Sequence, residues 1–161
     1  MSTEEDQKLS REHFQRAYAR QMKGELDEAV ELYKKSIEVL PTAEAHTFLG
    51  WTYSFMGRPQ DAIAECHRAI EVDPDFGNPY NDIGAYLIEQ GALDEAIPWL
   101  EKATRAPRYE SYCFPHFNLG RIYEQKRLWR KAIDCYRASL GHNRQYLLAN
   151  VALRRLQAMM N

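Results

Sequence analysis

Small residues and prolines recur along this chain with a period of 33 to 36 residues. A period of this length predicts a stack of like supersecondary units, none of which buries its hydrophobic face without a neighbour. Chance does not readily place several residue types in one register, so the repeat constrains the fold more than any other feature. Four sets keep the register: Gly24, Gly57 and Gly91; Ala29, Ala62, Ala96 and Ala132; Gly50, Gly84 and Gly120; Pro41, Pro74 and Pro107.

Each set has a physical role in a helix–turn–helix unit. The glycines of the Gly50 set and the alanines of the Ala29 set let two helices approach closely. The glycines of the Gly24 set end the first helix, because glycine adopts a positive φ without a Cβ penalty. The prolines end the second helix, because proline lacks the N–H that a helix interior uses. The repeat therefore predicts paired helices.

The best-preserved copy is Tyr80–Pro107. It matches the pattern W-x2-L-G-x2-Y…A-x3-F…P, with tyrosine in place of the first tryptophan. In this pattern the chain resembles the tetratricopeptide repeat (TPR) family over about Ser10–Met159. The resemblance implies an all-α, right-handed superhelical solenoid of about four helix–turn–helix units plus a C-terminal capping helix. The matching residues are Tyr80, Ile83, Gly84, Leu87, Gly91, Ala96, Leu100 and Pro107.

The expected organisation is a single domain over residues 10–159, with residues 1–9 either flexible or extending the first helix. Two positions in the fourth repeat depart from the pattern, because Arg127 replaces the turn glycine and Arg144 the closing proline. The third repeat is two residues longer than usual, and the excess falls near 106–113. The expected repeats are 10–42, 43–76, 77–112 and 113–146, followed by a capping helix at 145–159.

Composition limits the classes of function. The 161 residues are 45% hydrophobic and 27% charged, with a net charge of −2, which is an ordinary balance for a soluble domain. This net charge gives no electrostatic footprint for nucleic acid or an anionic membrane, and no apolar run reaches the roughly 18 residues of a membrane span. Three cysteines, an odd number, suggest a reducing compartment. We therefore expect a cytoplasmic protein, or a soluble part of a larger one.

The resemblance implies that the first helix of each unit lines a concave groove for a peptide or a partner helix. We expect Trp51 and Phe55 to be an exposed apolar anchor, and Asn81 and Asn118 to bond a peptide backbone, because an amide both donates and accepts. The alternative for Phe48 and Phe117 is burial between neighbouring first helices. The expected groove residues are Phe14, Tyr18, Phe48, Trp51, Phe55, Asn78, Asn81, Asp82, Phe114, Phe117, Asn118 and Arg121.

Several other kinds of site are not expected. Family members that bind chaperone C-terminal carboxylates use a cluster of lysine, arginine and asparagine, and the matching positions here are mostly aromatic, acidic or small. Cys113 and His116, with His142, do not complete a zinc site. We expect His46 and His116 to pack in the helix pair, Cys66 and Cys135 to be small core residues, and Asp61, Glu65, Asp94 and Glu95 to lie at helix starts, where the helix dipole favours carboxylates. No cofactor, no metal and no enzyme activity are expected.

The sequence therefore predicts a non-catalytic scaffold or adaptor that binds a peptide or helix of another protein. One alternative is a homo-oligomeric scaffold that pairs through Leu156, Met159 and Met160. Another is a bacterial pilus or secretion assembly factor, because the link LEKATRAPRYESY resembles the corresponding link of pilus-assembly lipoproteins. That link, with Tyr109 and Tyr112, is a second candidate binding surface, unless a longer second helix takes up its extra residues.

Overall fold

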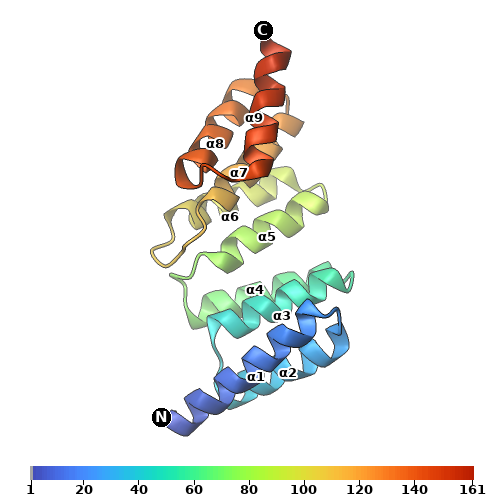
Figure 1. Cartoon of the computed structure of the whole chain (residues 1–161), viewed down its shortest axis with the longest axis vertical. Coiled ribbons are helices and arrows are strands. Elements are labelled where there is room, and N and C mark those ends of the chain that lie inside the picture. Colours follow the sequence, from blue (N-terminus) through green and yellow to red (C-terminus); the bar gives the residue numbers. More distant parts are fainter. Residues whose placement is uncertain (1) are drawn as a thin grey trace. The chain divides into compact units, whose positions relative to one another are not determined.

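The computed structural model describes residues 2–161, and these residues form helices joined by short turns, with no β-strand (Figure 1). The prediction of an all-α chain built from helix pairs is thereby confirmed. The helices are α1 (Glu4–Met22), α2 (Leu26–Val39), α3 (Ala43–Phe55), α4 (Pro59–Val72), α5 (Asn78–Glu89), α6 (Leu93–Arg105), α7 (Cys113–Gln125), α8 (Trp129–His142) and α9 (Leu147–Met160).

The chain divides into two compact units, Met1–Asp82 and Ile83–Asn161. Helices α1 to α4 belong to the first unit and α6 to α9 to the second, while α5 begins in one and ends in the other. In the first unit α1 packs on α2, α3 on α4, and α2 on α3. In the second unit α7 packs on α8, α6 on α7, and α8 on α9. Within each unit, these helices therefore pack on their neighbours in sequence.

A capping box starts the first helix. The Thr3 hydroxyl accepts a hydrogen bond from the Asp6 backbone N–H, and the Asp6 carboxylate accepts one from the Thr3 backbone N–H. Glu4 and Glu5 complete an acidic first turn, which the positive end of the helix dipole favours. Helix α1 therefore begins at Glu4, well before the first residue of the expected repeat array.

The turn between the helices of each pair needs one residue with a positive φ. Gly24, Gly57 and Gly91 take this conformation, with φ of 78°, 71° and 77°. In the last pair the same position holds Arg127, at φ 60°. Arg127 therefore has the same backbone conformation as the turn glycines, although its Cβ makes this left-handed conformation unfavourable.

Glycines on the first helix of a pair allow the second helix to come close. A Cβ built on Gly50 would lie 2.9 Å from the Ala62 carbonyl oxygen. A Cβ built on Gly120 would lie 2.5 Å from the ring of Tyr136. Neither distance is open to a real side chain, so these positions need glycine for packing, as the spacing predicts.

The extra residues of the third repeat lie in a link and not in a longer helix, because α6 ends at Arg105 and α7 begins at Cys113. A hydrogen bond joins the two ends of this link, because the Tyr112 hydroxyl donates to the Ala106 carbonyl. The Tyr109 and Tyr112 rings lie 5.3 Å apart between centroids, and Tyr112 also contacts the His142 ring at 5.5 Å. Tyrosine packing therefore shapes this segment.

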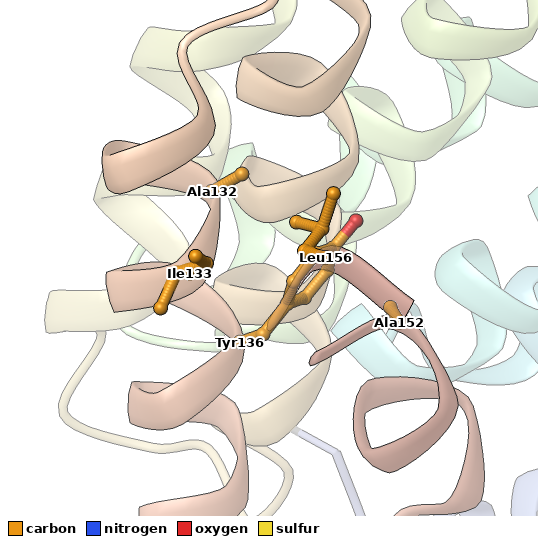
Figure 2. Packing of buried hydrophobic residues seen from close by; sticks show 5 residues of the cluster. All are labelled: Ala132, Ile133, Tyr136, Ala152 and Leu156. Carbon is orange, nitrogen blue, oxygen red and sulfur yellow. The ribbon is translucent and has the colours of Figure 1, made fainter. Parts of the chain in front are cut away.

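Helix α9 covers the end of the second unit (Figure 2). Its Ala152 and Leu156 pack against Ala132, Ile133 and Tyr136 of α8. Leu156 is fully buried, so it is not available for the pairing with a second copy that one alternative assigns to it. Its spacing from Ala152 places it on the inward stripe of the helix. Among residues 2–161, no helix combines the length and the apolar character needed to cross a bilayer.

Candidate functional site: helix faces that carry exposed aromatic residues

A row of five aromatic rings crosses α1 and α3 in the first unit. Phe14 and Tyr18 of α1 contact Phe48 of α3, with ring centroids 5.3 and 5.9 Å apart. Phe48 contacts Trp51 at 5.8 Å, and Trp51 contacts Phe55 at 5.1 Å. Most of these contacts are edge-to-face, the arrangement that the ring quadrupole favours. The structure thus brings together all five aromatic residues predicted for the groove of this unit.

The two ends of the row are exposed and its middle is not. Tyr18 is 43% exposed and Phe55 is 59% exposed. Trp51 is half-buried between Phe48 and Phe55, so the prediction that the tryptophan itself is the exposed anchor needs correction. Helical spacing places neighbours at i−3 and i+4 on one face, and both neighbours of Trp51 are phenylalanines. Phe55 is therefore the ring with the largest free surface.

The structure agrees better with the alternative that Phe48 and Phe117 pack between neighbouring helices than with full exposure in a groove. Phe48 is half-buried and also lies near Tyr33 of α2, with centroids 6.3 Å apart. Phe117 is half-buried between Tyr136 of α8 and Tyr146, at 5.6 and 5.2 Å. Both rings fill the space between neighbouring helices and leave an edge at the surface.

The polar residues at the start of α5 are less accessible than the groove prediction assumes. Asn81 is buried, with 8% exposed, while Asn78 and Asp82 are half-buried. Burial raises the pKa of the Asp82 carboxyl to about 7, and a side-chain hydrogen bond from Asn81 works in the opposite direction. The Asn81 amide therefore serves a neighbouring carboxyl and offers a ligand only a small area.

On α7 the predicted residues form a second, separate set. Phe114 is 40% exposed and its ring contacts Tyr146 at 5.4 Å. Asn118 is buried, with 7% exposed, and its side-chain oxygen accepts from the Arg121 guanidinium at 3.2 Å. Arg121 also donates to Glu89 at 3.0 Å. The set thus combines one exposed ring, one buried amide and one half-buried cation.

A buried contact between a histidine and a carboxylate escaped the sequence prediction. The His46 Nδ1 lies 2.7 Å from the Glu65 carboxylate, and both residues are buried. Arg68, one turn further along α4, donates to the other oxygen of Glu65. Glu65 also lies in the middle of α4 and not at its start, so the interpretation that the helix dipole explains this carboxylate is wrong. His46 is packed in the helix pair, and no signal in the sequence links it to an acid 19 residues away.

The histidines and cysteines of the second unit are packed and not grouped around a metal site. The His116 and His142 rings are stacked, 5.1 Å apart with an interplanar angle of 11°. Burial and the neighbouring His142 lower the pKa of His116, and burial raises the pKa of the Cys113 thiol. Residues 2–161 contain no group of three His, Cys, Asp or Glu side chains placed to hold a metal ion.

This architecture, helix hairpins stacked by small-residue contacts, defines an all-α solenoid. Two family models described as tetratricopeptide repeat match the chain, over residues 49–110 and 116–149. The chain belongs to the tetratricopeptide repeat family, and the predicted TPR solenoid is confirmed.

Three similar proteins illustrate the relationship. Mouse tetratricopeptide repeat protein 21B is 24% identical over 110 residues, which are 68% of this chain and 8% of that protein. The structure of PilF from Pseudomonas aeruginosa is 22% identical, with a TM-score of 0.90 over 98% of this chain and 71% of that one. YrrB, described as a TPR protein with an unusual peptide-binding site, is 20% identical, with a TM-score of 0.70 over 88% of this chain and 73% of that one. The chain spans 8% to 22% of the length of the curated relatives that it matches.

Proposed function

We propose that this chain is a non-catalytic protein-interaction scaffold and that a segment of a partner protein docks on the aromatic row of α1 and α3. The continuous row from Tyr18 to Phe55 carries the proposal, because it joins α1 and α3 and ends in two exposed rings. Membership of the TPR family supports a role in protein interaction, as does the likeness to a peptide-binding member.

The row suits a partner that presents large apolar side chains. Aromatic residues are frequent hot spots of interfaces, because they bury a large area with few rotatable bonds. The half-buried rings of Phe48 and Trp51 hold the exposed rings in place, so little side-chain freedom is lost on binding. The partner segment would lie across Tyr18 and Phe55, and the polar edges of Asn78, Asn81 and Asp82 would contribute at most a few hydrogen bonds. Phe114, Phe117, Asn118 and Arg121 would form a second stretch on the other unit.

The test is a capture experiment with a matched control. Full-length wild-type chain, the variant Tyr18→Ser/Phe55→Ser and the control Leu9→Ser/Val72→Ser are immobilised, and proteins captured from the native lysate are quantified by mass spectrometry. Leu9 and Val72 are each 44% exposed but lie outside the row, so the control removes similar apolar surface elsewhere. We expect one or more proteins to bind the wild type and the control and to be lost from the row variant. Partners that survive in both variants would contradict the proposal.

A pilus-assembly role is a second candidate for the pathway in which the scaffold acts. The observation that favours it is the fold: PilF aligns over 98% of this chain with a TM-score of 0.90, and PilW, described as a type IV pilus biogenesis factor, aligns with 0.84. At 22% and 18% identity this likeness concerns the fold alone. The same capture experiment separates the candidates, because a pilus role predicts pilus-assembly proteins among the partners that depend on the row.

A further inference from the structure

The exposed apolar residues of α9 are in register with the groove positions of α7. Leu148 and Val151 follow Phe114 and Phe117 by 34 residues, the repeat period. Leu148 is 56% exposed and Val151 is 54% exposed. The outer face of a capping helix is normally polar, so these two side chains depart from what a cap requires.

The face of α9 on which the second helix of a repeat would pack is polar, in contrast. The positions at which a second helix would pack, one period after His116, Gly120 and Tyr123, hold Asn150, Arg154 and Gln157. The apolar surface of α9 therefore lies on the same side as Phe114 and Phe117, next to the Tyr146 ring that contacts both. It continues the α7 face as a second helical row.

Two arginines in the same register lie beside this apolar row. Arg155 follows Arg121 by 34 residues, and Met159 follows Gln125. These four residues line one hollow of about 480 Å³, together with Glu124 and Trp129. The α7/α9 face, defined as Phe114, Phe117, Arg121, Leu148, Val151 and Arg155, is therefore apolar at one end and carries guanidinium groups at the other.

The arginines are held in a way that leaves them able to bind a carboxylate. Arg121 donates to Glu89, whose side chain is 71% exposed, and such exposed pairs contribute little. Arg155 donates to Glu124, which also accepts from the Tyr136 hydroxyl at 2.7 Å and is thereby fixed. A guanidinium carries five N–H donors in a planar fork, so Glu124 orients Arg155 without saturating it.

Residues 113–161 have a strongly positive net charge, although the net charge of the whole chain is slightly negative. Residues 113–161 contain nine Lys and Arg residues and two Asp and Glu residues, which gives +7, whereas the whole chain has −2. Helix α9 itself contains Arg154 and Arg155 and no acidic residue. Charge asymmetry of this kind indicates an anionic partner for one part of a chain.

We propose that the α7/α9 face binds an acidic and apolar segment of a partner protein. A large apolar side chain of the segment lies on Leu148 and Val151, and a carboxylate lies on Arg121 and Arg155. Val151 and Arg155 are one helical turn apart, about 6 Å along the axis. This spacing corresponds to an acidic residue two positions from the apolar one in an extended segment, or four positions from it in a helix, on either side.

Other occupants fit the face less well. Parallel pairing of α9 with α9 of a second copy would bring Arg155 of both copies together, which like-charge repulsion opposes. On an anionic lipid surface, Arg155 would lie between Val151 and Met159, in the stripe that has to enter the apolar layer, whereas membrane-surface helices keep their charges on the opposite face. The proposal rests on the proposed function in that the chain binds protein segments and that Phe114, Phe117 and Arg121 belong to the second stretch proposed there. It does not use the aromatic row.

The probe is a phage-displayed library of random dodecapeptides, panned on the full-length chain at low salt. We expect enriched sequences with an aspartate or glutamate two or four positions before or after a large apolar residue. The most enriched sequence is then made as a fluorescein-labelled peptide, and its affinity is measured by anisotropy. Leu148→Ser/Val151→Ser and Arg121→Gln/Arg155→Gln should each weaken binding by about tenfold or more, equivalent to about 1.4 kcal/mol. The arginine variant should also show a smaller loss of affinity with added salt.

Matched controls use similar residues of the same unit outside the face. Leu128→Ser removes a leucine that is 41% exposed, and Arg130→Gln removes an exposed cation of α8. Both should bind within twofold of the wild type, and circular dichroism melts check that every variant is folded. Equal weakening by control and face variants would overturn the proposal.

The remaining outcomes are also decisive. Peptides that lose affinity only in Tyr18→Ser/Phe55→Ser would leave the proposed function standing and overturn this inference. No enrichment of acidic peptides would overturn it as well, while the lysate capture independently decides the proposed function. Binding to phosphatidylcholine–phosphatidylglycerol vesicles, or a dimer in sedimentation equilibrium, that is lost in Leu148→Ser/Val151→Ser would reassign the face to lipid or to a second copy.

Discussion

The substitution Gly120→Ala tests whether close packing explains the repeated glycines. A Cβ at this position would lie 2.5, 2.7 and 3.0 Å from three ring carbons of Tyr136. The ring has nowhere to move, because Tyr136 is 1% exposed, packs in the cluster with Leu156, and donates from its hydroxyl to Glu124 at 2.7 Å. Either the ring leaves this position or α7 and α8 move apart.

The magnitude follows from two opposing effects. Overpacking in a well-packed core costs about 1–3 kcal/mol. Replacement of a helix-interior glycine by alanine contributes about 1 kcal/mol in the other direction, because alanine has the higher helix propensity. Since Tyr136 is fixed on several sides, we expect the steric cost to be near the top of its range and the free energy of unfolding to fall by about 1–2 kcal/mol.

The control is Gly141→Ala, near the end of α8. A Cβ at Gly141 would meet no atom within 4 Å, so only the propensity effect remains. We expect this variant to gain up to about 1 kcal/mol. Both variants are compared with the wild type by urea unfolding, followed by far-ultraviolet circular dichroism at 25 °C.

The two variants should move the urea midpoint in opposite directions. With a slope of about 2 kcal/mol per molar urea, Gly120→Ala should lower the midpoint by about 0.5–1 M, and Gly141→Ala should leave it unchanged or raise it. If Gly120→Ala raises the midpoint as much as Gly141→Ala does, contact with Tyr136 does not explain the glycine.

Three further predictions concern the backbone and buried charges. Arg127→Gly should raise the free energy of unfolding by up to about 1 kcal/mol, because glycine tolerates the φ of 60° found there; an unchanged or lower urea midpoint would contradict this. Glu65→Ala should cost about 1–3 kcal/mol, because it leaves buried His46 without its carboxylate, and Glu65→Gln should cost less; equal losses would argue against the pair. Burial raises the pKa of Asp82 from 3.8 to about 7, so the folded chain binds this proton more tightly than the unfolded chain, and stability should fall as pH rises from 3.8 to about 7. Asp82→Asn should flatten that fall in urea titrations across this range, and the same slope in both proteins would refute the cause.

The sequence alone determined the fold class, because the interactions that define it recur at short, regular spacings. The turn glycines, the small residues at Gly50 and Gly120 and the closing prolines act between helices adjacent in sequence. The same pattern of packing residues recurs in each repeat, so one irregular position, such as Arg127, does not obscure it.

For the aromatic residues of α3, the sequence indicated the shared helix face but not the exposure of each ring. Helical periodicity shows that Phe48, Trp51 and Phe55 share a face. It does not show that α1 and α2 cover part of Phe48 while Phe55 stays exposed, because exposure depends on side chains that other helices supply.

Only the tertiary structure decided which polar groups are paired. His46 and Glu65 meet across two helices, and Arg121 of α7 donates to Glu89 of α5, although no sequence spacing marks these contacts. Hydrogen bonds and ion pairs depend on distances of a few ångströms and on side-chain orientation. A periodic pattern shows which side chains share a face of a helix. The residues of the neighbouring helices decide which hydrogen bonds and contacts each of these side chains makes.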